Sequence, residues 1–374
     1  MKLLPLLIAP AACLGVAAAF APAASDWTVN GSTPMSTPRA AHQATLLSAR
    51  EVLFTGGCSG PGCSPVEASA EVLDLGTGRM LAAPPMQERR VSHVSALLPD
   101  RRVLVAGGWT GSAASPTAEV YDPANRRFKA VGAMATARMD ATATVLQDGS
   151  VLVIGGASAT NLPVAQAERF DPTLDRFVPA STLAEARAHH AAVRLPDGRV
   201  LVMGGLTSRN TATRTAEIHD PASQRFQPTG PLLQPRCKHA ALLLKDGRVM
   251  VIGGSADCNE GRRLAQTEIY DPATATFSAG PSLLNPRYKV ASAAAVLPGG
   301  EVVMAGGADD VEIWIPGQPH FARARGSIGL GLAFSVATVL PDGDVLVSGG
   351  YDNNIQATAR TWRVQHLPGK PVAR

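Results

Sequence analysis

Short apolar runs, each four or five residues long, recur along the chain and alternate with turn-forming residues. The run from Val200 to Met203, for example, follows Pro196-Asp197-Gly198 and ends at the doublet Gly204-Gly205. An Asp-Gly pair between two apolar runs favours a tight β-hairpin, because both turn positions favour positive φ. The same pair recurs at Asp148, Asp246 and Asp342, and Gly299-Gly300 takes its place once. The pattern predicts an all-β protein built from short antiparallel strands.

The chain repeats this arrangement seven times, once for each Gly-Gly doublet. The doublets lie 43 to 53 residues apart and begin at Gly56, Gly107, Gly155, Gly204, Gly253, Gly306 and Gly349. In most repeats an Arg begins the first strand, the doublet ends the second, and an Ala-Glu-x-aromatic-Asp-Pro motif marks the third. A Phe six residues after that Asp marks the fourth strand, as Phe128 does after Asp122. Because these aromatic residues repeat at one register, we interpret them as core packing.

A period near 50 residues with this doublet is the signature of the kelch repeat. The chain resembles the kelch β-propeller family from residue 25 to 374, and the resemblance implies one all-β domain with seven blades of four antiparallel strands. The seventh repeat lacks its fourth strand, whereas Trp27 precedes Gly31 by four residues as Phe128 precedes Gly132. We therefore expect residues 26–31 to supply the outer strand of the last blade, which removes an open sheet edge.

Residues 1–24 have the composition of a signal peptide. A positively charged start is followed by an apolar stretch from residue 3 to 20, and Ala21-Pro22-Ala23 has the small-x-small spacing of a cleavage site. A membrane anchor needs about 20 apolar residues in a row, and two prolines and a glycine interrupt this stretch. Lipid attachment at Cys13 is a further alternative. We expect export to the periplasm or the extracellular space, and no membrane span.

Charge and cysteine content narrow the class of protein further. The 34 Lys and Arg against 30 Asp and Glu leave a net charge of +4 over 374 residues, which excludes nucleic acid as a partner on charge alone. Four cysteines remain after export, an even number that favours disulfides. Cys58 and Cys63 lie in one loop, and Cys237 and Cys258 lie at positions that the propeller brings together.

Two positions of the first strand carry candidate chemistry. Arg begins six of the seven first strands, at Arg39, Arg90, Arg138, Arg187, Arg236 and Arg287. Because the residue repeats, it either bonds carbonyls or the repeated Glu between blades, as part of the framework, or contacts a ligand. Three residues later stand His42, His93, His190 and His239. These histidines either hydrogen-bond the neighbouring blade or form an incomplete metal-capable ring at the channel mouth.

The segments Arg90-x-x-His93…Leu98-Pro99-Asp100 and Arg187-x-x-His190…Leu195-Pro196-Asp197 resemble the kelch domain of galactose oxidase. The resemblance implies copper ligation by a His of this motif, with His42, His93, His190 and His239 as the matching positions. That family places Tyr directly before such a His, where this chain has Ala41, Ser92, His189 and Lys238. We therefore expect no cofactor, and copper-dependent carbohydrate oxidation stays an alternative function.

Sialic acid mutarotases are similar to this chain in length, export and fold. The likeness implies acid–base groups at the same channel mouth. The candidates in this chain are Arg236, Arg287, His190 and His239, with a carboxylate such as Glu260 or Asp309. Acid–base epimerisation of a carbohydrate is therefore a second alternative.

A local excess of positive charge distinguishes repeats four to six. The loops and strand starts expected at the channel mouth there carry Arg209, Arg214, Lys238, Arg262, Arg263 and Lys289. A carboxylated sugar or an acidic peptide would suit this sector, although a mixed, solvated rim is the alternative. We expect a monomeric binding module rather than an enzyme, and the question of activity stays open. Its protein or carbohydrate ligand would contact Arg236, Arg287, His190, His239, Trp109 and Tyr351.

Overall fold

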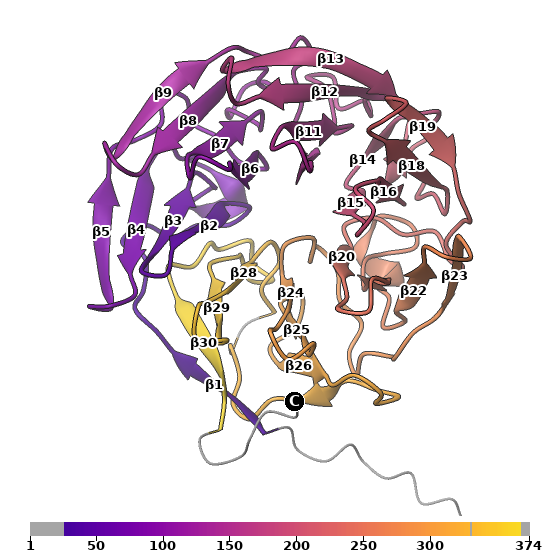
Figure 1. Ribbon diagram of the computed structural model, residues 1–374. Coiled ribbons are helices and arrows are strands. Elements are labelled where there is room, and N and C mark those ends of the chain that lie inside the picture. Colours follow the sequence, from indigo (N-terminus) through magenta and orange to yellow (C-terminus); the bar gives the residue numbers. More distant parts are fainter. Residues whose placement is uncertain (1–25, 330, 368–374) are drawn as a thin grey trace, which may run out of the picture.

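The computed structural model describes residues 26–329 and 331–367 of the chain. Seven four-stranded antiparallel sheets stand around a common centre, each with its first strand innermost (Figure 1). This arrangement confirms the predicted all-β propeller with seven blades. The predicted signal peptide, residues 1–24, lies outside the described residues.

The first three blades follow one another without interruption along the chain. Blade 1 contains β2 (Gln43–Ser48), β3 (Glu51–Thr55), β4 (Ala70–Asp74) and β5 (Arg79–Ala83). Blade 2 contains β6 (Val94–Leu97), β7 (Val103–Ala106), β8 (Ala118–Asp122) and β9 (Arg127–Val131). Blade 3 contains β10 (Thr142–Val145), β11 (Val151–Ile154), β12 (Gln166–Asp171) and β13 (Arg176–Thr182). A short helix, η1 (Pro61–Cys63), interrupts the loop between β3 and β4.

The next three blades have the same order. Blade 4 contains β15 (Ala191–Arg194), β16 (Val200–Met203), β18 (Ala216–Asp220) and β19 (Arg225–Pro228), with the small pair β14 (Arg187–Ala188) and β17 (Leu206–Thr207). Blade 5 contains β20 (Ala240–Leu243), β21 (Val249–Ile252), β22 (Glu268–Asp271) and β23 (Thr276–Ala279), with η2 (Glu260–Arg262). Blade 6 contains β24 (Ala294–Val296), β25 (Val302–Ala305), β26 (Val311–Trp314) and β27 (Ala322–Arg323).

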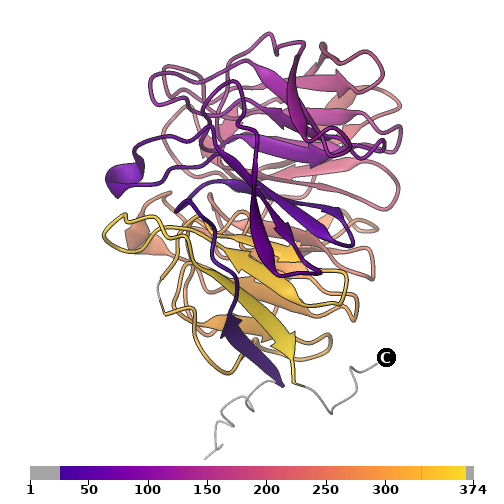
Figure 2. The same cartoon turned by 90° about the vertical axis from the view of Figure 1, so that its left-hand side faces the viewer.

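Blade 7 joins the two ends of the described chain. It contains β28 (Val336–Val339), β29 (Val345–Ser348), β30 (Thr361–His366) and, as its outer strand, β1 (Trp27–Gly31). The strands β1 and β30 are antiparallel, with Trp27 opposite His366 and Gly31 opposite Trp362 (Figures 1 and 2). The predicted closure by an N-terminal strand is therefore confirmed.

The core lies between the blades rather than inside any one of them. The second strands β7, β11, β16, β21, β25 and β29 are buried along their whole length. Farther out, Tyr121 packs on Phe128 with ring centroids 4.9 Å apart, and Tyr270 packs on Phe277 at 4.8 Å. The repeated aromatic residues are thus packing residues, as expected from their common register.

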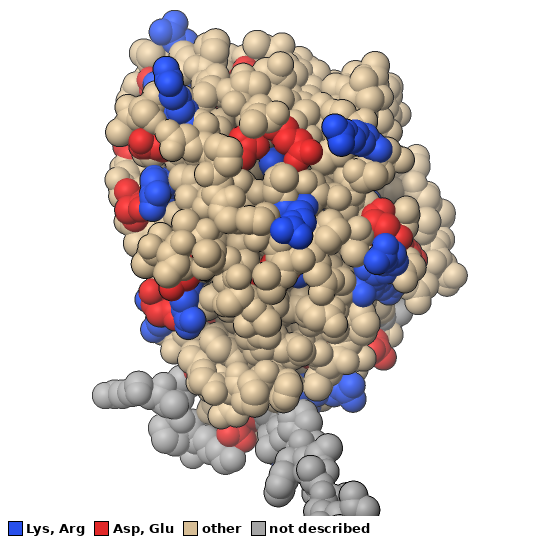
Figure 3. Space-filling view, turned by 90° about the vertical axis from the view of Figure 1, so that its right-hand side faces the viewer, with Lys and Arg blue, Asp and Glu red and all other residues tan. Residues whose placement is uncertain are grey.

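The low share of charged residues and the four cysteines of the sequence are both reflected in the structure. On the face drawn in Figure 3, uncharged side chains cover most of the area and the charged ones are scattered. Both expected disulfides form, between Cys58 and Cys63 and between Cys237 and Cys258. Two disulfides indicate an oxidising, non-cytoplasmic compartment. Within residues 26–329 and 331–367, no helix is long and apolar enough to cross a membrane.

Candidate functional site

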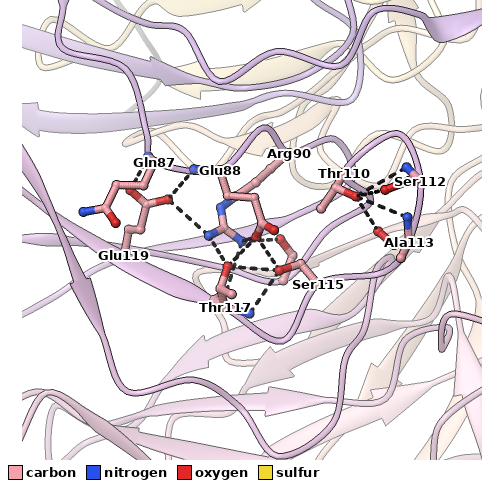
Figure 4. Close-up of polar contacts among 10 residues, drawn as sticks. Gln87, Glu88, Arg90, Thr110, Ser112, Ala113, Ser115, Thr117 and Glu119 are labelled. Atoms are coloured by element: carbon pink, nitrogen blue, oxygen red, sulfur yellow. Dashed lines mark hydrogen bonds and ion pairs between the residues drawn. The ribbon is translucent and has the colours of Figure 1, made fainter.

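The repeated first-strand arginines are buried inside the blades. Arg90 is fully buried, and its guanidinium donates to the carbonyl oxygens of Gly107 at 2.9 Å and Thr117 at 3.0 Å (Figure 4). It also donates to the carboxylate of Glu119 at 3.1 Å, and that carboxylate accepts the backbone N–H of Gln87 at 2.7 Å. Arg90 and Glu119 belong to the same blade. The pair therefore fixes the start of the first strand against the third strand of its own blade.

Arg236 and Arg287, which we expected to contact a ligand, occupy the same framework position. Arg236 is fully buried and donates to the carbonyl of Gly253 at 3.0 Å and to Glu268 at 2.5 Å. Arg287 is equally buried and donates to Glu312 at 2.8 Å. Both side chains are fully buried, so they are not exposed to a ligand in the channel. The geometry therefore fits the framework interpretation of both residues rather than the ligand-binding one.

The four histidines lie between adjacent blades. The Nε2 atom of His42 is 2.9 Å from Ser348 Oγ, and that of His93 is 3.0 Å from Thr55 Oγ1, each in the preceding blade. The Nε2 atom of His190 is 3.0 Å from Oγ1 of Thr142, which lies on the first strand of the preceding blade. All four are buried, and burial lowers the pKa of His42, His93 and His239 to about 3 and that of His190 well below its usual value. They are neutral at physiological pH and unsuited to acid catalysis there.

These histidines also do not fit copper. Each ring packs on the first glycine of the preceding blade's doublet, so that a Cβ on Gly204 would come within 2.8 Å of His239 Cε1. In the part of the chain that the structure describes, no three His, Cys, Asp or Glu side chains gather into a metal-binding group. No reaction step through copper is therefore assigned to this site.

A ring of seven residues, one from each blade, surrounds the channel mouth. We call it the mouth ring: Ala41, Ser92, Asp140, His189, Lys238, Lys289 and Phe334. All seven have left-handed backbone conformations, with φ between 50° and 59°. Backbone hydrogen bonds of 2.9 to 3.3 Å run from blade to blade around the ring, with Val290 donating in place of Lys289. The left-handed backbone conformation is therefore repeated in every blade, while the side chains differ.

The mouth ring opens onto a cavity of about 260 Å³ along the propeller axis. The walls of the cavity also carry small residues such as Ala192, Ala241 and Ser292. Among its described lining residues, the charged side chains are those of Asp140 and Lys238, both in the mouth ring. The chemistry of this face depends on which side chains the mouth ring carries.

The charged and aromatic side chains gather on one side of the mouth. Lys238 Nζ donates to Tyr288 Oη at 3.0 Å, and Tyr288 in turn donates to the carbonyl oxygen of Cys258. Lys289 Nζ donates to Tyr351 Oη at 2.9 Å and to Glu260 at 3.2 Å. Both ammonium groups lie over the Tyr288 ring, 5.3 and 5.4 Å from its centroid. We call the five residues whose side chains take part the lysine–tyrosine cluster: Lys238, Tyr288, Lys289, Tyr351 and Glu260.

The electrostatics of the two lysines differ. Burial is the main cause that lowers the pKa of Lys238, and the neighbouring Lys289 adds to it. For Lys289 the burial effect is outweighed by the hydrogen bonds to Tyr351 and Glu260, so its pKa is raised. Burial raises the pKa of Tyr288 to about 12. Among the described residues, Lys238 has no carboxylate within 4 Å, whereas Lys289 has Glu260.

Comparisons with known proteins support the fold and the repeats. The kelch motif family model matches residues 90–135 and 236–284. The matched residues belong to blades 2 and 5. The chain is a seven-bladed β-propeller with kelch motifs. The solved structure of YjhT is similar in fold, with a TM-score of 0.57 and 13% identity, covering 89% of this chain and 99% of that one. No curated protein matches the chain in sequence.

The kelch framework explains which expected ligand residues come together. Tyr351 lies at the mouth beside Phe334, with ring centroids 5.7 Å apart, and accepts a hydrogen bond from Lys289. Trp109 and Tyr351 both pack against the small apolar cluster that contains Cys58 and Val91, and neither lines the cavity itself. Of the expected ligand residues, Tyr351 is thus the one whose polar group joins the cluster at the mouth.

Other residues at the mouth were not among the expected ligand residues. Asp140 and His189 are neighbours in the mouth ring, with Oδ1 and Nδ1 3.5 Å apart. Tyr288 adjoins Lys289 in sequence, and the disulfide Cys237–Cys258 holds the loop that carries Glu260 near it. Asp140 and His189 could have been found from the sequence by comparing the position directly before each repeated His or its counterpart, because its residue type changes from repeat to repeat.

Proposed function

We propose that this kelch propeller is an exported, monomeric binding module whose mouth ring takes a carboxylate-bearing ligand, on either a protein or a carbohydrate. Kelch propellers are commonly protein-interaction modules. The two disulfides support an exported location, which the signal-peptide composition of residues 1–24 also favours. A single chain closes its own ring through β1, which supports a monomer.

One observation carries the proposal: the half-buried ammonium of Lys238 at the edge of the cavity. Its neighbours within hydrogen-bonding distance include a neutral tyrosine, and no carboxylate of the described residues lies within 4 Å. A partly desolvated cation costs free energy until an anion approaches it. A ligand carboxylate would supply that anion, and Tyr351 and Phe334 would offer apolar contact beside it.

Titration calorimetry with polygalacturonate, poly-glutamate and uncharged dextran tests this function. We expect one or both polyanions to bind and dextran to give no signal. Replacing Lys238 with Gln removes the charge and should weaken polyanion binding about tenfold or more. Lys129 is the matched control, because its side chain is 76% exposed on the outer strand β9. Equal binding by K238Q and the parent protein would show that the ligand does not sit at the mouth ring.

The polyanion that binds also distinguishes the ligand class. Binding of polygalacturonate alone supports a carbohydrate ligand, whereas binding of poly-glutamate alone supports an acidic protein segment. Binding of neither polymer contradicts the proposed carboxylate ligand. Because both polymers carry the same charged group, a difference between them reports on shape rather than on charge.

A further inference from the structure

We propose that Lys238 is a nucleophilic amine that holds a carbonyl-bearing ligand at the mouth ring as a reversible imine. The chemical class we infer is a 2-oxo acid, in which a carbonyl group adjoins a carboxylate. This inference rests on the proposed function, because it concerns the same site and the same ligand charge. It adds a covalent step, and that step can fail while anion binding stays.

Geometry gives Lys238 the surroundings that a reactive amine requires. Its backbone is held by the mouth-ring hydrogen bond to His189 at 2.9 Å and by the adjacent disulfide at Cys237. Its side chain reaches the cavity edge and is held against Tyr288. A nucleophilic lysine is activated by desolvation or by a second cationic group nearby. Lys238 has both, because Lys289 lies over the same tyrosine ring.

Charged groups from several blades surround this amine. Asp140 of blade 3 and Glu260 of the η2 loop favour its protonated form, whereas Lys289 of blade 6 disfavours it. Burial has the largest effect and also disfavours the protonated form, so the pKa of Lys238 is lowered. Tyr288 stays neutral because its own pKa is raised to about 12. A larger fraction of Lys238 is therefore the free amine at neutral pH than of an exposed lysine.

Lys289 provides the positive charge that would face the carboxylate of the proposed ligand. Lys289 is fixed by Tyr351 and Glu260, and its side chain is only 17% exposed. The two ammonium groups share one tyrosine ring, so a small molecule with two adjacent polar groups can face both of them. A 2-oxo acid places its carbonyl carbon at Lys238 and its carboxylate toward Lys289.

The covalent step is balanced without a further reactant. The ammonium of Lys238 first loses a proton to solvent at the open mouth, and the nitrogen lone pair attacks the carbonyl carbon. The nitrogen releases a proton to solvent and the carbonyl oxygen takes one up, giving a neutral carbinolamine. Its hydroxyl oxygen takes up a second proton from solvent, the carbon–oxygen bond breaks and water leaves, while the nitrogen lone pair forms the carbon–nitrogen double bond. The protonated imine then returns a proton to solvent. Nothing is oxidised or reduced, so the step reverses when water adds back.

Reductive trapping on the full mature chain tests this step. The protein is incubated with pyruvate and cyanoborohydride near neutral pH, and the modified lysines are located by peptide mass spectrometry. We expect the adduct at Lys238 to exceed that at the exposed Lys129 several-fold. Equal modification of the two lysines, or none at Lys238, would overturn the inference. In a parallel reaction with butanone, a ketone without a carboxylate, a ratio of Lys238 to Lys129 labelling equal to that found with pyruvate would overturn the assignment of a carboxylate.

Two variants separate this inference from the proposed function. K238R keeps a positive charge without a nucleophilic amine, so it should retain polyanion binding and lose the trapped adduct at this position. K289Q removes the neighbouring cation, so the pH at which half of Lys238 becomes labelled should shift upward. An unshifted pH profile in K289Q would contradict activation by the second lysine. If K238Q loses polyanion binding but the parent protein forms no adduct, the covalent step fails and the binding function stands.

Discussion

Two rings of side chains, built by the same seven repeats, differ in almost every physical respect. The framework arginines are the same residue in six blades, are fully buried and bond carbonyls and a carboxylate of their own blade. The mouth ring lies only a few residues farther along each first strand, and it carries six different residue types on one repeated backbone conformation. Repetition therefore marks the residues that hold the blades, whereas the mouth ring varies in its side chains on a repeated backbone conformation.

The comparison also shows why the sequence alone did not separate framework residues from candidate ligand residues in repeats four to six. The excess of positive charge in repeats four to six was visible, and it includes Lys238 and Lys289. Arg236 attracted attention because it is a strong carboxylate ligand in general. Its carboxylate partner, Glu268, comes from the repeated motif of the third strand in the same blade. The repeated Glu was one of the partners expected for this Arg, but spacing alone does not decide between that pairing and a ligand.

The largest expected effect comes from removing the closing strand. Deleting Trp27–Gly31 exposes the edge of β30 and removes Trp27, which is 4% exposed, from the core between blades 6 and 7. We expect the free energy of unfolding, measured in urea, to fall by more than about 5 kcal/mol, a large part of a typical domain's stability. Asn30→Ala, on an exposed position of the same strand, should cost less than about 1 kcal/mol. Similar effects of the two changes would contradict the closure.

The next largest effect tests the framework ring itself. Arg187→Ala leaves the buried carboxylate of Glu217 without its partner at 2.9 Å. Leaving one charge of a buried pair uncompensated typically costs about 3–5 kcal/mol. The matched control is Arg199→Ala, which breaks an exposed pair with Asp197 in the same blade and should cost about 0–1 kcal/mol. Chemical denaturation of both variants measures the difference, and equal losses would contradict a framework role.

A pH titration of stability tests the buried histidines. The pKa of His42 is about 3 in the folded protein because of burial, against about 6.5 in an unfolded chain. The unfolded chain binds more protons between these values, so stability is full above pH 6.5 and falls as the pH decreases toward 3. The slope for one histidine is at most about 1.4 kcal/mol per pH unit.

The variant His42→Gln should flatten this slope, whereas His320→Gln, at an exposed position, should leave it unchanged. Urea unfolding at several pH values between 3 and 7 measures both. An unchanged slope in His42→Gln would mean that this ring does not stay neutral between the blades.

Much of the fold was predictable because the same local signals recur. The Asp-Gly turns, the Gly-Gly doublets and the outer aromatics each repeat at one register, so the strands and their order follow from spacing. The closing strand was predictable because Trp27 and Gly31 match a fourth-strand pattern. The mouth cluster was less predictable, because Tyr288, Tyr351 and Glu260 come from different loops and meet only when the ring closes.

The smallest expected effect on stability belongs to the mouth ring, and it gives the most direct test of the account. Lys238 should be dispensable for folding and required for binding, unlike Arg187 in the framework. The measurement is the polyanion affinity of K238Q by calorimetry, with its unfolding free energy determined on the same preparation. We predict a stability change within about 0.5 kcal/mol and an affinity loss of about tenfold or more. Unchanged affinity in a stably folded K238Q would contradict the account.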